Sequence, residues 1–202
     1  MAQTPSTVEQ NVAGRLMLNV HSVDLTDDQF YQLCLDNPEL RFELTAKREL
    51  VIMPPTGSKT GWRNSKINQR LANWAEEDGT GVSFDSSTGF TLPDGAKRSP
   101  DGAWVRREVW EALTDEQQEE FAPICPDFVI ELRSAKDGLA GLEEKMKEYI
   151  ENGARLGWLL DANNRRVYIY RPNHPVECLE NPSSISGGPL LPGFEFDPSE
   201  IW

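Results

Sequence analysis

A near-continuous apolar run, RLGWLLDA at residues 155–162, sets the strongest limit on the architecture of this chain. Such a run is typical of a β-strand that is covered on both faces of its sheet. Asn163 and Asn164 follow as a tight-turn pair, and the alternating segment RRVYIYR at 165–171 predicts the hairpin partner of this strand. The sequence therefore requires a sheet with covering layers on both sides.

Helical patterns supply those layers. Apolar residues recur at helical spacing from Ser58 to Asp78, and a second amphipathic pattern spans Leu139 to Ile150. Thr26 is a plausible N-cap for a helix that ends before Pro38. Charged, helix-like sequence also spans 108–121, and strands are expected within 40–53, 81–85, 89–93, 99–105 and 126–132. Helices interspersed with strands predict an α/β sandwich with a mixed central sheet flanked by helices.

The length of 202 residues suits one domain, which we place at 24–202, after a partly flexible leader at 1–23. No apolar run approaches the ~18–20 residues of a transmembrane helix, so we expect no membrane partner. The three cysteines form no paired motif and favour reduced thiols, which are typical of a cytoplasmic protein. The two histidines, His21 and His174, are too isolated for a metal site.

A net charge of -13 excludes a protein that coats nucleic acid through overall basicity. One local basic stripe nevertheless recurs at helical spacing within 58–78 and shares a narrow sector of that helix. The stripe predicts contacts with nucleic-acid phosphates, although a solvated helix face explains it equally well. Its residues are Lys59, Arg63, Lys66 and Arg70.

Acidic residues embedded in strand-like segments are the main chemical signal. Glu43 lies in LRFEL, Asp101 begins a strand in RSPDGAWV, and Glu131 lies in CPDFVIELRS. A buried carboxylate is costly unless a cation or hydrogen bonds compensate it. These three acids therefore predict a site for Mg²⁺ or Mn²⁺, which would polarise a phosphodiester and lower the pKa of bound water.

A cation is needed beside such a site to stabilise developing negative charge. Arg133 follows Glu131 by two residues and shares its strand face, and Lys145 borders the apolar stripe of the helix at 139–150. Lys145 therefore leans toward the sheet, whereas Lys147 is less favourably placed. Tyr168 and Tyr170 alternate on a late strand and suggest a homodimer surface.

Several motifs together resemble the Uma-two family of restriction endonuclease-like proteins, a branch of the PD-(D/E)XK nuclease superfamily. They are VIMPPTG, FDSSTGFTLPDG, RSPDGAWVRREVWEAL, CPDFVIELRS, EEKMKEYIENGARLGWLLD, RRVYIYRP and LPGFEF. The resemblance implies a restriction-endonuclease-like core in which Asp101 and Glu131 bind the metal and Glu43 is an added acid. Arg133 stands where the superfamily has its lysine, and the resemblance implies that Lys145 takes this role.

These observations predict a Mg²⁺-dependent endonuclease that hydrolyses phosphodiester bonds of DNA with a metal-activated water. A catalytically inactive nuclease-fold module for nucleic-acid or protein interaction remains the alternative, because Arg133 replaces the expected lysine. Paired acids also serve glycoside hydrolases, but the chain shows no extended aromatic platform for sugar.

Overall fold

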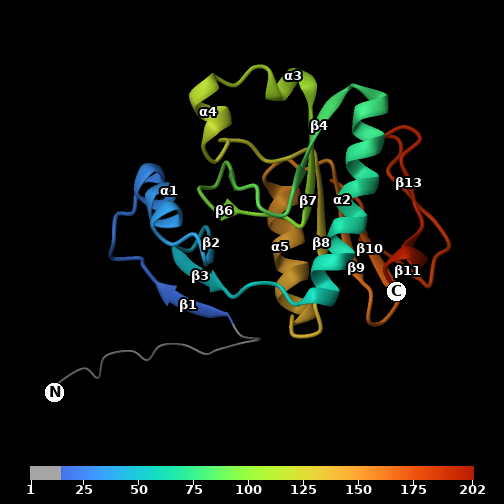
Figure 1. Ribbon diagram of the computed structural model, residues 1–202, viewed down its shortest axis with the longest axis horizontal. Coiled ribbons are helices and arrows are strands. Elements are labelled where there is room, and N and C mark those ends of the chain that lie inside the picture. Colours follow the sequence, from blue (N-terminus) through green and yellow to red (C-terminus); the bar gives the residue numbers. More distant parts are fainter. Residues whose placement is uncertain (1–14) are drawn as a thin grey trace.

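A six-stranded mixed sheet forms the centre of the computed structural model, which describes residues 15–202 (Figure 1). Its strand order is β11-β10-β9-β8-β7-β4, with β8 and β9 parallel and the other neighbouring pairs antiparallel. The parallel pair is joined by helix α5. The sequence prediction of a mixed central sheet flanked by helices is therefore confirmed. The helices and strands are β1 (Leu16–Asn19), α1 (Asp27–Asp36), β2 (Arg41–Leu44), β3 (Glu49–Met53), α2 (Ser58–Asp78), β4 (Gly81–Asp85), β5 (Phe90–Thr91), β6 (Lys97–Arg98), β7 (Gly102–Arg106), α3 (Arg107–Trp110), α4 (Asp115–Glu119), β8 (Phe128–Leu132), α5 (Leu139–Glu151), β9 (Leu156–Asp161), β10 (Arg166–Tyr170), β11 (Glu177–Glu180), β12 (Ile185–Ser186), β13 (Glu195–Phe196) and the 3₁₀ turn η1 (Pro198–Glu200).

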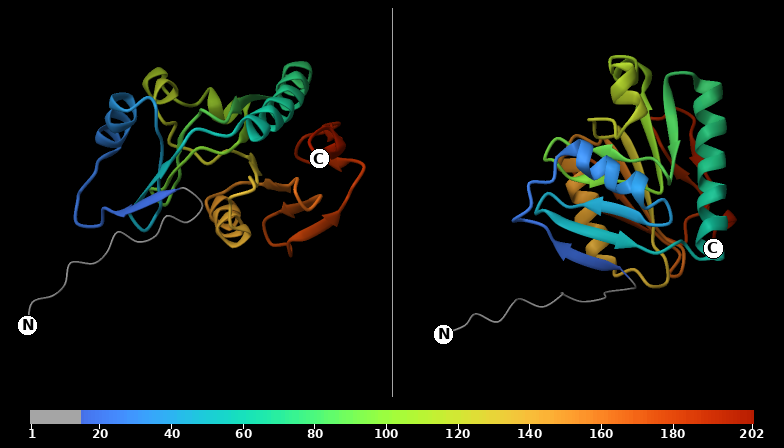
Figure 2. Two further views of the ribbon diagram at one scale, coloured as in Figure 1. Left: turned by 60° about the horizontal axis from the view of Figure 1, so that its bottom comes forward. Right: turned by 60° about the vertical axis from the view of Figure 1, so that its left-hand side comes forward.

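Both faces of the six-stranded sheet are covered, as the apolar run at 155–162 requires. All six residues of β9 are buried. Helix α2 and the C-terminal segment from β12 onward pack on one face, where Trp158 and Phe194 stack at 5.5 Å between ring centroids. Helix α5 packs on the other face through Leu142, Met146 and Tyr149. Figure 2 shows α2 and α5 on opposite sides of the sheet.

A second, five-stranded sheet with the order β1-β3-β2-β6-β5 lies beside this core. Its hairpin β2–β3 matches the predicted strands at 40–53, and α1 covers it through Phe30. Thr26 forms the predicted N-cap of α1 within a capping box. Of the predicted leader at 1–23, residues 1–14 lie outside the described part, whereas β1 pairs with β3.

Two sequence expectations need correction. The segment 108–121 forms the short helices α3 and α4 rather than one helix, because Thr114 starts a new helix with its own capping box. Tyr168 and Tyr170 are buried against α5, so they cannot provide the exposed dimer surface suggested by their alternation. Within residues 15–202, no helix is both long and apolar enough to cross a bilayer.

Candidate active site

Asp101 and Glu131 come together at one end of the six-stranded sheet. Asp101 directly precedes β7, Glu131 lies near the end of β8, and these two strands are antiparallel neighbours. The Asp101 carboxylate accepts a hydrogen bond from the Leu132 backbone N–H at 2.8 Å and another from the Asn64 amide at 2.7 Å. Strand pairing therefore fixes the two acids predicted to bind a metal beside one another.

Lys145 reaches this site from α5, as its position on the helix predicted. Its Nζ lies 2.7 Å from Glu131 Oε1 and 2.7 Å from Glu43 Oε1. Tyr149, one turn later on α5, donates its hydroxyl to Glu131 Oε1 at 3.1 Å. Lys147 points away and is exposed. The same helix face thus supplies the cation and a hydrogen-bond donor.

Glu43 is the centre of a buried ionic network rather than a free ligand. Arg98 Nη1 lies 3.0 Å from Glu43 Oε2, and the Ser99 backbone N–H donates to Oε1 at 3.2 Å. Arg98 also pairs with Glu148 at 2.5 Å. Within residues 15–202, no group of three acidic, histidine or cysteine side chains is arranged to hold a metal. The expectation that Glu43 joins Asp101 and Glu131 as a third metal ligand therefore needs correction, because its carboxylate is paired with Lys145 and Arg98.

The pKa values of the acids diverge in this network. Burial alone would raise the pKa of Glu43, but the charges of Lys145 and Arg98 lower it to about 2. Burial raises the pKa of Glu131 to about 7; Asp101 and Glu43 contribute to this rise, against the pull of Lys145. Burial also raises the pKa of Asp101, against hydrogen bonds from Leu132 and Asn64. Asp101 and Glu131 are thus the two acids whose ionised forms are not fully stabilised by the neighbouring cations.

The donor set of Asp101 and Glu131 fits a hard divalent cation. Three of the four carboxylates here, Glu43, Glu131 and Glu148, share the paired cations Lys145 and Arg98. Asp101 makes no ion pair within residues 15–202, and the charges of Lys145 and Arg41 act on it from a distance. The buried Oδ1 of Asn64 has no hydrogen-bond partner in the described part of the chain, although its amide nitrogen binds Asp101. Mg²⁺ is commonly held by one or two carboxylates and several waters. Asp101 and Glu131 would hold such an ion, and a water on it would satisfy Asn64.

Arg133 does not join the site, although its spacing of two residues from Glu131 suggested that it would. Its Nη1 lies 2.6 Å from Asp161 Oδ2, and its Nε donates to the Asp137 carbonyl at 3.1 Å. Asp161 ends β9 and is fully buried, so it draws the guanidinium away from the acids. Lys145 therefore occupies the place beside Glu131 that Arg133 was considered for.

The basic stripe of α2 faces the C-terminal segment rather than the acids. Arg63 is buried and donates to the Ile201 carbonyl at 2.7 Å, and Arg70 forms an ion pair with Glu200 at 2.9 Å. Lys59 is exposed and Lys66 is half-buried. The prediction that all four residues contact phosphates is corrected for Arg63 and Arg70, whose donors are engaged by residues at the end of the chain.

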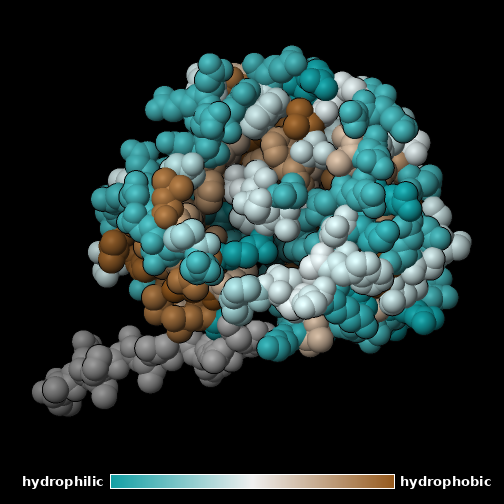
Figure 3. Space-filling model, in the orientation of Figure 1, coloured by the Kyte–Doolittle hydropathy of each residue, from teal (hydrophilic) through white to brown (hydrophobic). Residues whose placement is uncertain are grey.

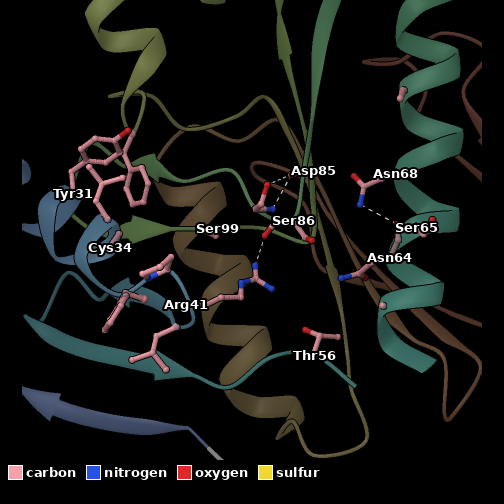
Figure 4. A pocket seen from close by; sticks show the side chains of 18 of the residues that line it. Tyr31, Cys34, Arg41, Thr56, Asn64, Ser65, Asn68, Asp85, Ser86 and Ser99 are labelled. Atoms are coloured by element: carbon pink, nitrogen blue, oxygen red, sulfur yellow. Dashed lines mark hydrogen bonds between the residues drawn. The ribbon is translucent and has the colours of Figure 1, made fainter. Parts of the chain in front are cut away.

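Two connected hollows surround the site. The first, about 380 Å³, is lined by Glu43, Asp101, Glu131 and Lys145. The second, about 920 Å³, lies between α1 and α2, and both are lined by Arg41, Thr56 and Ser99. Figure 4 shows Arg41 reaching into the second hollow toward Ser86, with Asn64 and Asn68 extending from α2. Figure 3 shows hydrophilic residues at the centre of this face and a hydrophobic patch toward its left-hand side.

Three residues of the site were not singled out from the sequence. Arg41 shares the face of β2 with Glu43, and this two-residue spacing was an available signal. Asn64 is a polar residue inside the apolar stripe of α2, which also marks it as unusual. Arg98 carries no such signal, because β6 has only two residues.

Comparison with known proteins identifies the family and the fold of this chain. The model of the family Uma2, described as "putative restriction endonuclease", matches residues 27–199. The crystal structure of a "putative nuclease belonging to DUF820" from Anabaena variabilis superposes with a TM-score of 0.71 at 19% identity, covering 87% of this chain and 96% of that chain. At this identity, the structural match shows a shared fold. A search of the curated proteins gave no match.

Proposed function

This chain belongs to the Uma2 family, and from that membership we propose that it is a Mg²⁺- or Mn²⁺-dependent endonuclease that hydrolyses phosphodiester bonds of DNA. The observation that carries the proposal is the pair of buried acids, Asp101 and Glu131, with Lys145 2.7 Å from Glu131. A divalent cation bound there would polarise the phosphodiester and lower the pKa of the attacking water.

The protein's own residues have separate roles in this proposal. Asp101 and Glu131 hold the cation, and the strand pairing fixes their separation. Lys145 carries its proton throughout, because Glu131 and Glu43 raise its pKa against the effect of burial. Its ammonium therefore positions the attacking water by hydrogen bonding and stabilises negative charge on the phosphate. Glu43 orients Lys145, and Arg98 holds Glu43 from the other side.

Isosteric variants test the proposal. Purified protein should nick plasmid DNA in Mg²⁺ or Mn²⁺, and Asp101→Asn or Glu131→Gln should reduce the rate at least ~100-fold by removing a ligand charge. Glu180→Gln, an exposed acid on the edge strand β11, is the matched control and should nick like wild type. Wild type as inert as Asp101→Asn across both metals, on plasmid and on single-stranded DNA alike, would refute the proposed activity.

Metal binding separates an enzyme from an inactive nuclease fold. Calorimetry with Mn²⁺ should give one site that weakens in Asp101→Asn and Glu131→Gln but persists in Glu180→Gln. Binding should also raise the melting temperature, since a ligand at 100 times its Kd adds ~2.7 kcal/mol of stability. A protein with no Mn²⁺ binding and no nicking would instead support a non-catalytic interaction module.

A further inference from the structure

The larger hollow leads directly to the acid pair. It has a volume of about 920 Å³ and shares Arg41, Thr56 and Ser99 with the hollow that contains Asp101 and Glu131. A polymer lying between α1 and α2 therefore passes Arg41 before it meets the acids. A long substrate that reaches the acids can therefore also bind in the larger hollow.

Arg41 has positive charge available for a ligand. Its only side-chain hydrogen bond in the described residues goes to the carbonyl oxygen of Ser86, and among residues 15–202 it makes no ion pair. Lys145, Arg98 and Arg15 are each paired with a carboxylate, whereas Lys136 of the smaller hollow also makes no ion pair within residues 15–202. A guanidinium with free donors is well suited to a phosphate group.

The remainder of the larger hollow is nearly neutral. Amide and hydroxyl side chains of α2 line one side, among them Ser65, Asn68 and Gln69, whereas Tyr31 and Phe121 lie on the other with ring centroids 5.6 Å apart. Amides can bind the edges of bases, and aromatic rings can stack on their faces. Stacking on a ring requires an unpaired base, whereas amides can also bind base edges in the groove of a duplex.

A duplex has little to bind here. Duplex-binding proteins neutralise several phosphates at once, whereas this hollow offers one unpaired cation and also contains the carboxylate of Asp85. Arg63 and Arg70 of α2 are engaged by the C-terminal segment, and Lys59 and Lys66 of the same helix do not line the hollow. A single strand has lower charge density and exposes its base edges.

We propose, on the basis of the nuclease function above, that the hollow between α1 and α2 binds single-stranded nucleic acid and that Arg41 holds a phosphate of this strand beside the acid pair. The substrate class is thus a single strand or a single-stranded region within a longer DNA or RNA.

Fluorescence anisotropy in Ca²⁺ tests this binding without relying on cleavage. The probes are a labelled DNA oligonucleotide, the RNA of the same sequence and the blunt DNA duplex. We expect at least one single strand to bind about tenfold or more tighter than the duplex, and the tighter of the two identifies the preferred sugar. Equal or tighter binding of the duplex would overturn the proposal.

Arg41→Ala should weaken single-strand binding about tenfold and reduce the slope of log K against log salt by about 0.7, the value for one phosphate contact on a single strand. Arg41→Lys retains the charge and should keep the slope. Its binding then shows that a substitution at this position does not by itself disrupt the fold. Arg166→Ala, which removes an exposed arginine on β10, is the control and should change neither quantity. An unchanged slope in Arg41→Ala would refute the role of Arg41.

The two proposals fail in different ways. Nicking that requires Asp101 but is unaffected by Arg41→Ala, with no preference for single strands, would refute this inference and leave the nuclease function standing. Arg41-dependent single-strand binding without metal-dependent cleavage of any probe would support this inference and refute the nuclease activity on which it was based.

Discussion

Replacing Lys145 with methionine should destabilise the fold as well as the site. The substitution keeps an unbranched apolar stem as far as the ε position but removes the ammonium 2.7 Å from both Glu43 and Glu131, which are 3% and 4% exposed. Removing one partner of a buried ion pair costs ~3–5 kcal/mol, because it leaves a buried charge uncompensated. Glu43 retains Arg98, so the unpaired charge falls mainly on Glu131, and at pH 8 the loss should approach about 3 kcal/mol.

Urea unfolding in EDTA, followed by tryptophan fluorescence, measures this loss. With a slope near ~2 kcal/mol per M, about 3 kcal/mol lowers the midpoint by ~1.5 M. Lys147→Met, two residues away and exposed, should stay within ~0.5 kcal/mol of wild type. The double variant Lys145→Met/Glu131→Gln should recover most of the loss, because its second change removes the stranded charge.

The effect of pH provides an independent check on the electrostatic cause. Without Lys145, the folded-state pKa of Glu131 rises further above its value in the unfolded chain. Such a raised pKa reduces stability as pH increases from the unfolded value toward the folded one. The deficit of Lys145→Met should therefore be larger at pH 8 than at pH 5. A deficit below ~1 kcal/mol at pH 8, or one independent of pH, would refute this reasoning.

Three further predictions concern other parts of the molecule. In metal-free wild type, burial raises the pKa of Glu131 from its ordinary 4.5 to about 7. Glu131→Gln should therefore remove a stability loss of up to about 3 kcal/mol that develops between pH 4.5 and 7, measured by urea unfolding at each pH. Thr26→Ala should cost ~1 kcal/mol by removing the cap of α1, seen as a lower melting temperature, whereas an unchanged melting temperature would show that the cap contributes nothing. Gly81→Ala should lower the melting temperature far more than Thr26→Ala, because its Cβ would lie 2.3 Å from the Trp104 ring and 2.4 Å from the Val105 carbonyl oxygen; a smaller drop would mean that β4 moves freely.

Local patterns predicted the elements of the fold well. The helix expected from Ser58 to Asp78 has those bounds in the structure, since its apolar stripe packs on the sheet and Gly79 ends it with a φ of 71°. The run at 155–162 is a fully buried strand because layers on both faces cover it. In these segments, the sequence pattern that determines the secondary structure lies within the helix or strand itself.

The partners of charged side chains were harder to predict because they come from distant sequence. Arg133 has the right spacing from Glu131, but Asp161, 28 residues later, draws it away. Arg63 belongs to a regular basic stripe, yet its acceptor lies 138 residues later, at Ile201. Periodicity places a side chain on a face of its own element, and only the packing of elements decides what that face meets.

The charge network around Lys145 also links the order of folding to the time at which the site forms. Glu43 and Lys145 are separated by 102 residues, and Glu43 and Arg98 by 55. Contacts between residues so far apart close large loops, and the entropy of closing them must be paid before the contacts can stabilise the chain. A nascent or partly folded chain would thus have Glu43 apart from Lys145 and Arg98. The complete charge network can therefore form only in a molecule whose two sheets have packed against one another.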